Sequence, residues 1–199
     1  MSLLARIIRK YTSCKRSILA RLLCQDFPRV HSGLCLHVGC GDINLPGWIN
    51  IDARSLSHVH LVTNDLTLAE FNDNSISAIY LCHVLEHFPF KTTKAVLDIF
   101  SRKLKFVGVL YLAVPDFCKI AEAYMSRKDI PSILPALMGG QDYEHNFHYA
   151  VFDRESLTKQ LLASEFSVVG SFEPADLLGN AFHDFSTHPL SLNLKAIKA

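Results

Sequence analysis

A glycine turn between two apolar runs is the first place in this sequence that could do chemistry. The run from Leu34 to Val38 stops at Gly39-Cys40-Gly41-Asp42, and a second run ends at Asp52. Glycines permit a tight turn and let a ligand approach bare backbone. A carboxylate accepts hydrogen bonds and so can bind two vicinal ribose hydroxyls. The pattern indicates a nucleotide-type site at the edge of a parallel sheet.

The spacing within this stretch argues against two common nucleotide sites. The dinucleotide fingerprint GxGxxG needs a glycine where the chain has Asn44, and its acid lies about 20 residues further on, whereas Asp52 comes 13 residues after Gly39. A P-loop is excluded because the sequence contains no GKS or GKT. Since Pro46-Gly47 breaks any helix, the turn lacks the helix N-terminus that binds a pyrophosphate. A cofactor that contains a nucleoside but no phosphate fits this turn better.

Four histidines are candidates for a general base, because histidine is the natural proton acceptor near neutral pH. They are His83, His87, His145 and His148. His83 follows a buried apolar run, at the edge where such sheets bind ligands, and His145 and His148 lie in an aromatic, histidine-rich segment. The alternative for all four is a hydrogen-bonded structural imidazole. Asp116, after a later strand, either faces an acceptor or forms a turn.

A zinc-peptidase pattern competes for the same residues. The stretch His83-Val84-Leu85-Glu86-His87 matches H-x-x-E-H, and Asp98 is the nearest carboxylate in the next helix. That pattern needs both histidines on one long helix, whereas this motif directly follows a buried strand. We therefore predict no metal among the site residues.

Apolar periodicity predicts the elements that must position these residues. Strands are expected at 34–38, 48–52, 58–63, 76–82, 109–114, 166–172 and 190–198, and helices at 91–104, 117–128 and 154–163. Residues 131–140 and 174–189 are expected to be irregular. Strands that alternate with helices predict an α/β fold, with a doubly wound, mostly parallel sheet and an antiparallel strand near the C-terminus.

The two parts of the chain differ in charge. Residues 1–33 are basic, with an amphipathic helix expected over 3–23 and then a linker, while 34–199 form the domain proper. Three roles are open for the basic helix: it packs on the domain, it contacts a membrane surface, or it is a transit peptide. The net charge of +1 predicts no sequence-specific nucleic-acid partner. Six cysteines without a CxxC pair indicate a reducing, cytoplasmic location, and no apolar run is long enough to span a membrane.

Taken together, the motifs LHVGCGD, INID, NDL and YLCHVLEHF resemble class I S-adenosylmethionine-dependent methyltransferases. They are most similar to small predicted methyltransferases of bacterial surface-polysaccharide and glycan-modification gene clusters, over about residues 34–170. The resemblance implies S-adenosylmethionine as the cofactor. It places the backbone of Gly39, Cys40 and Gly41 beside the methionine part, and the ribose hydroxyls on Asp52.

The resemblance also assigns the adenine and the reacting methyl group. Asp65 would accept from the adenine amino group, with the backbone N–H of Leu66 beside it. Leu81, Cys82 and His83 would flank the sulfonium. A sulfonium methyl is already activated, so transfer needs an in-line approach, and a hydroxyl acceptor also needs a base.

Two observations bear on the methyl acceptor: a motif that the sequence lacks, and the resemblance to the methyltransferase family. The sequence lacks the Asn/Asp-Pro-Pro-Tyr/Phe motif of amino-directed enzymes, because Leu81-Cys82-His83-Val84 occupies that place. This favours an oxygen or small-molecule acceptor, and the resemblance suggests a glycan. The alternative is a partner or scaffold protein with a methyltransferase fold and no activity.

Overall fold

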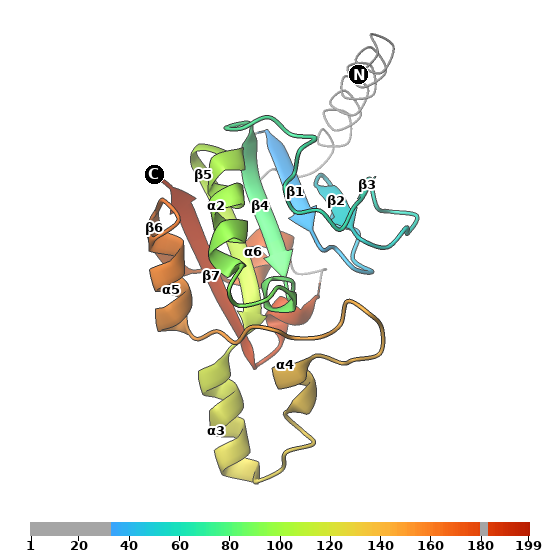
Figure 1. The fold of residues 1–199 in the computed structure, drawn as a ribbon, viewed down its shortest axis with the longest axis vertical. Coiled ribbons are helices and arrows are strands. Elements are labelled where there is room, and N and C mark those ends of the chain that lie inside the picture. The colour runs from blue at the N-terminus through green and yellow to red at the C-terminus, as the bar shows by residue number, and fades with distance from the viewer. Residues whose placement is uncertain (1–32, 180–182) are drawn as a thin grey trace.

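The computed structural model describes residues 33–179 and 183–199 (Figure 1). The basic helix predicted over 3–23 and the linker that follows it lie outside the described residues. Among the described helices, none combines the length and the apolar character needed to cross a bilayer.

A seven-stranded sheet forms the centre of the described chain, in the order β3-β2-β1-β4-β5-β7-β6. The strands are β1 (Leu34–Val38), β2 (Ile49–Asp52), β3 (Leu61–Val62), β4 (Ile76–Cys82), β5 (Leu104–Pro115), β6 (Phe166–Ser171) and β7 (Ser191–Lys198). Strands β1 to β5 pair in parallel, and β7 runs antiparallel to both of its neighbours. This confirms the predicted α/β fold with an antiparallel strand near the C-terminus.

Short and long helices surround the sheet, and two of them extend beyond the carboxyl ends of the central strands (Figure 1). The helices are α2 (Thr93–Lys103), α3 (Phe117–Arg127), α4 (Leu134–Met138), α5 (Arg154–Leu162) and α6 (Pro174–Leu178), with 3-10 turns η1 (Leu85–His87) and η2 (Phe185–Thr187). The two that extend beyond the strands are α3 and α4, and α3 begins almost directly after β5.

Alternate side chains of β4 enter two separate cores, as the pleat of a strand requires. Ile79 and Leu81 belong to the larger core, which also contains side chains of α2 and α5. Tyr80 points to the other face, where Trp48 and Leu177 of α6 surround it. Because β4 is buried on both faces, its run of apolar residues is continuous, and the predicted bounds of this strand are confirmed.

The connection from β1 to β2 contains turns and no helix, as Pro46-Gly47 predicted. The backbone N–H of Cys40 donates to the carbonyl of Ile51 (3.0 Å), and that of Ile43 donates to the carbonyl of Cys40 (3.0 Å). The turn therefore folds back against β2 and lies beside Asp52.

Several predicted boundaries were wrong. The strand expected at 58–63 is reduced to two residues, because β3 pairs with β2 only through Leu61 and Val62. Strand β5 begins at Leu104 rather than 109, since Val107 (φ +55°) lies in an irregularity within the strand where the register with β4 shifts. The segments expected to be irregular contain α4, α6 and η2.

Candidate functional site

The strand order reverses at β1, which pairs with β2 on one side and with β4 on the other. Open α/β sheets bind ligands outside the carboxyl ends of the strands at such a switch point. Gly39 follows β1, Asp52 ends β2 and His83 follows β4. The fold therefore brings the three predicted parts of the site to one edge.

Asp52 joins the glycine turn to Arg54. Asp52 is buried, and its Oδ2 accepts from the backbone N–H of Gly41 (2.8 Å). Its Oδ1 accepts from the backbone N–H and the Nε of Arg54, at 2.9 and 3.2 Å. We call Gly39, Cys40, Gly41, Asp52 and Arg54 the β1–β2 corner. Since a carboxylate accepts about four hydrogen bonds, Asp52 keeps acceptor capacity for a ligand.

The two glycines of the turn have different environments, although both have positive φ (+65° and +55°). A Cβ on Gly39 would lie 2.3 Å from Cγ2 of Val84, so the absence of a side chain there is required by packing. A Cβ on Gly41 would meet only Nη2 of Arg54, at 3.4 Å. Between them, burial raises the pKa of the Cys40 thiol to about 12, which makes it a poor nucleophile.

Buried His37 lies in β1, directly before the turn between β1 and β2, and hydrogen-bonds to β2. The Nδ1 of His37 lies 3.2 Å from Oδ1 of Asn50, and its ring stacks on Tyr80 with centroids 5.2 Å apart. Burial lowers the pKa of His37 to about 4, so the ring is neutral and Nδ1 donates. Asn50 also donates to Oδ1 of Asn44 (2.8 Å), and Nε2 of His58 lies 2.9 Å from the carbonyl of Gly41. These contacts fix the turn between β1 and β2.

The predicted adenine residues lie close to this corner in the chain. The backbone N–H of Thr63 donates to the carbonyl of Asp52 (2.9 Å), and Asp65 follows two residues later. Asp65 is exposed and accepts from the backbone N–H and the hydroxyl of Thr67, both at 2.8 Å. These hydrogen bonds lower the pKa of Asp65. The Leu66 side chain packs against the larger core.

At the end of β4, the side chains of Leu81 and Cys82 point to opposite faces. Leu81 is buried in the larger core, so only its backbone can reach a ligand at the edge. Cys82 lies on the Tyr80 side, where the Tyr80 hydroxyl donates to Oδ2 of Asp184 (2.6 Å). Burial, followed by the negative charge of Asp184, raises the pKa of the Cys82 thiol.

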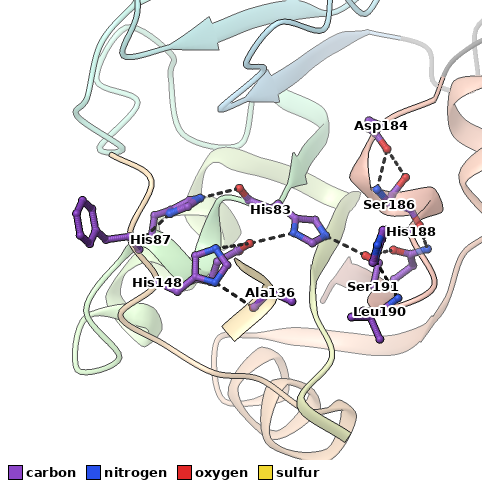
Figure 2. A network of polar contacts seen from close by, with 12 residues as sticks. His83, His87, Ala136, His148, Asp184, Ser186, His188, Leu190 and Ser191 are labelled. Carbon is purple, nitrogen blue, oxygen red and sulfur yellow. Dashed lines mark hydrogen bonds and ion pairs between the residues drawn. The ribbon is translucent and has the colours of Figure 1, made fainter. Parts of the chain in front are cut away.

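His83 is held in a left-handed backbone conformation (φ +53°), which is uncommon outside glycine. Its Nδ1 lies 3.3 Å from Oε1 of Glu86, and its Nε2 lies 3.2 Å from the hydroxyl oxygen of Ser191 on β7 (Figure 2). Phe185 contacts the ring, with centroids 5.5 Å apart. The His83 side chain is therefore oriented from both of its nitrogens.

The structure separates the two histidines that the sequence had grouped. His148 lies against Glu86, with Nε2 3.9 Å from Oε1, and burial lowers its pKa. His145 is about half exposed, and its Nε2 lies 3.5 Å from Oε1 of Glu144. We call His83, Glu86, His87 and His148 the β4 corner. The H-x-x-E-H stretch runs from a strand end into the three-residue turn η1, rather than along one helix.

One segment contacts both corners. Residues 139–149 carry Tyr143, whose ring lies under the Arg54 guanidinium (5.5 Å to the ring centroid), and also His148 of the β4 corner. Sequence reasoning missed Arg54, although a cation two residues after a strand-end acid was a usable signal. It also missed Ser191, which lies far from His83 in the sequence and is brought there by the antiparallel pairing of β7 with β5.

The fold matches several solved methyltransferase structures. An S-adenosylmethionine-dependent methyltransferase from Archaeoglobus fulgidus matches with a TM-score of 0.55 and 13% identity, over 96% of this chain and 94% of that one. The 1,6-didemethyltoxoflavin-N1-methyltransferase of Burkholderia thailandensis, with bound 1,6-didemethyltoxoflavin and S-adenosylhomocysteine, matches with 0.56 and 15%, over 92% and 78%. A possible histamine N-methyltransferase from Thermotoga maritima matches with 0.52 and 12%, over 97% and 92%.

These likenesses concern the fold. No protein-family model matches the sequence, and no curated protein does. The structural neighbours are S-adenosylmethionine-dependent methyltransferases with a Rossmann-like sheet, which this chain shares.

Proposed function

We propose that this chain transfers a methyl group from S-adenosylmethionine to a hydroxyl of a small molecule or glycan. The observation that carries the proposal is the meeting of the glycine turn, Asp52 and His83 at the switch point of the sheet. The likeness of the fold to methyltransferase structures supports the same cofactor class.

In this proposal the β1–β2 corner binds the cofactor. The remaining acceptor capacity of Asp52 takes a ribose hydroxyl, and the exposed Asp65 accepts from the adenine amino group. Gly41 leaves room for the methionine part, because its missing Cβ faces only Arg54. The Val84 side chain contacts Gly39 and so fixes the distance between the turn and the end of β4. The backbone at Leu81, Cys82 and His83 then flanks the sulfonium.

His83 is the proposed general base. In the tautomer with its proton on Nδ1, on the Glu86 side, Nε2 carries the lone pair and faces the Ser191 hydroxyl, which also lies 3.2 Å from Oδ1 of Asn193. An acceptor hydroxyl that takes the place of Ser191 at Nε2 would give its proton to His83 while its oxygen attacks the methyl carbon. Bound S-adenosylmethionine would supply the methyl group, and the electron pair of its broken carbon–sulfur bond would stay on sulfur. Residues 1–33, 130–150 and 174–189 are the proposed source of acceptor recognition.

The test is methyl transfer by the full chain from methyl-labelled S-adenosylmethionine to a panel of sugars and small alcohols. We expect release of S-adenosylhomocysteine that depends on one class of acceptor. His83→Gln should lower kcat by about 100-fold or more and leave cofactor affinity intact. Lys159→Gln, on the exposed side of α5 and outside the proposed acceptor segments, is the control. Full activity of His83→Gln would remove His83 as the base. Cofactor binding without turnover on any acceptor of the panel would contradict a sugar or small-alcohol acceptor.

The rival is a scaffold protein with the same fold. It predicts that neither S-adenosylmethionine nor S-adenosylhomocysteine binds. Mass spectrometry of the purified protein for either molecule separates the two proposals before any acceptor is known.

A further inference from the structure

We propose that Glu86, His87 and His148 form a binding site for a divalent transition-metal ion of the Zn²⁺ type. Each residue offers one ligand atom, and these atoms all lie within 4.8 Å of one another. They come from two segments that are far apart in the sequence, the η1 turn and the segment that follows α4. The site does not depend on the proposed methyl transfer.

Glu86 provides the first reason for a cation here. The residue is fully buried, and neither oxygen of its carboxylate accepts a hydrogen bond from the described residues. Its nearest titratable neighbours are ring nitrogens of His83 and His148, at 3.3 and 3.9 Å. A buried carboxylate without hydrogen bonds is costly unless it is paired or coordinates a metal.

His148 is already oriented as a metal ligand. Its Nδ1 lies 3.2 Å from the backbone carbonyl of Ala136, so Nδ1 carries the proton and donates. The other nitrogen, Nε2, then has its lone pair free and lies 3.9 Å from Oε1 of Glu86. Metal-binding histidines usually donate their second nitrogen to a carbonyl in this way, which fixes the tautomer.

His87 is in an unusual position, because both of its nitrogens face carbonyl oxygens. Nδ1 lies 3.0 Å from the carbonyl of Phe147, and Nε2 lies 3.1 Å from that of His83 (Figure 2). A neutral imidazole donates from one nitrogen only, so a metal ion can bind the other nitrogen after a small rotation of the ring away from its carbonyl.

The ligand set favours zinc over magnesium. Two imidazoles and one carboxylate are a common zinc set, whereas Mg²⁺ prefers oxygen ligands. Three protein ligands leave a coordination position open to water or another ligand. The arrangement differs from the H-x-x-E-H peptidase pattern, because His83 is not among the three ligands and His148 joins from outside the motif. A bound ion would tie the segment around His148 to the end of β4.

The test uses the full chain after treatment with a chelator. Zn²⁺ is titrated in competition with a chromogenic chelator, for the wild type and for His148→Ala, His87→Ala and Glu86→Gln. We expect one zinc ion per chain that each substitution weakens by at least about 100-fold, the upper range for loss of a ligand-supporting group. His145→Ala is the matched control, because His145 lies on the same segment, outside the cluster. Excess Mg²⁺ should not displace the zinc.

Two further readouts keep the proposal falsifiable if a variant folds poorly. Thermal unfolding with and without Zn²⁺ should show a rise in Tm for the wild type and for His145→Ala, and none for His148→Gln. Substitution with Co²⁺ should give visible absorption typical of a site with nitrogen and oxygen ligands. The proposal is wrong if zinc binds equally to wild type and His148→Ala, or if the wild type binds none, in which case a proton balances the Glu86 charge.

Discussion

The two corners at the edge of the sheet each contain a buried carboxylate, and the two carboxylates are in opposite states. Asp52 has three donors from its own chain, from Gly41 and Arg54. Glu86 has no hydrogen bond from the described residues, only histidine nitrogens at ion-pair distance. The first carboxylate fixes a turn and needs no ligand to be stable. The second carboxylate has no hydrogen bond to stabilise its negative charge, which a proton or a metal ion can balance.

The largest expected effect comes from filling the space at Gly39. Gly39→Ala combines a left-handed Cβ, which costs about 1–2 kcal/mol, with overpacking against Val84, which costs about 1–3 kcal/mol. We expect urea unfolding to show a loss of about 2–5 kcal/mol. This would show that the β1–β2 corner is fixed by contact with the end of β4.

Gly41→Ala is the control for Gly39→Ala, because its Cβ would meet only the flexible Arg54 side chain. Its loss should stay at about 1–2 kcal/mol. In a Val84→Ala background, Gly39→Ala should cost less than in the wild type, because only the Cβ of residue 84 remains near it, at 3.3 Å. Equal losses for the two glycines in the wild-type background would contradict the packing argument.

The next effect is a loss of stability in acid, caused by His37. In the unfolded chain this histidine binds a proton with a pKa of 6.5, but in the folded chain only at about 4. The unfolded state therefore binds more protons between these values, and stability falls as the pH falls from 6.5 to 4. The contribution is about 3 kcal/mol.

Urea unfolding at several pH values measures this contribution. His37→Gln keeps a donor for Asn50 and cannot titrate, so its free energy of unfolding should fall less steeply over the same pH range. Identical pH profiles for the two proteins would mean that His37 is not the buried neutral group described above.

Asp52→Asn should have a smaller effect on folding. The substitution keeps the shape but replaces one acceptor oxygen with an NH₂ group that faces another donor, and we expect a loss of about 1–3 kcal/mol in urea unfolding. Asp42→Asn is the control, since Asp42 is exposed and lies 3.6 Å from Arg54 without the backbone contacts. If the two variants unfold alike, the carboxylate of Asp52 does not stabilise the turn.

Asp65→Asn should have the smallest effect on stability. Asp65 is exposed and its two hydrogen bonds are local, both with Thr67, so the expected change is within about 0.5 kcal/mol. The affinity of the Asp65→Asn protein for S-adenosylmethionine should nevertheless fall, because the amide presents a donor to the adenine amino group. Unchanged affinity, measured by calorimetry, would remove Asp65 from the adenine site.

The sequence predicts the fold best where a strand is buried on both faces. The apolar runs of β1 and β4 ended where the strands end. The edge strand β3 was predicted too long, since the segment before it forms hydrogen bonds with the turn and with Asn50 instead. The dipeptide Val107-Gly108 predicted a turn before β5. In the structure it lies within β5, where Val107 has a positive φ and the strand is irregular.

The two corners differ in how far the sequence could predict them. Gly39 and Asp52 end neighbouring parallel strands, so their approach follows from the topology alone. The contact between Glu86 and His148 depends on the path of a long segment after β5, which no local pattern specifies. The sequence therefore ranked His145 and His148 together, and only the structure distinguishes them.

Calorimetric titration of S-adenosylmethionine into the full chain tests the central claim most directly. We predict one saturable site per chain, weakened about tenfold or more by Asp52→Asn and left intact by Asp42→Asn. Binding that Asp52→Asn does not weaken would move the cofactor away from the β1–β2 corner. No binding at millimolar S-adenosylmethionine would contradict the proposed function and favour a scaffold protein with a methyltransferase fold.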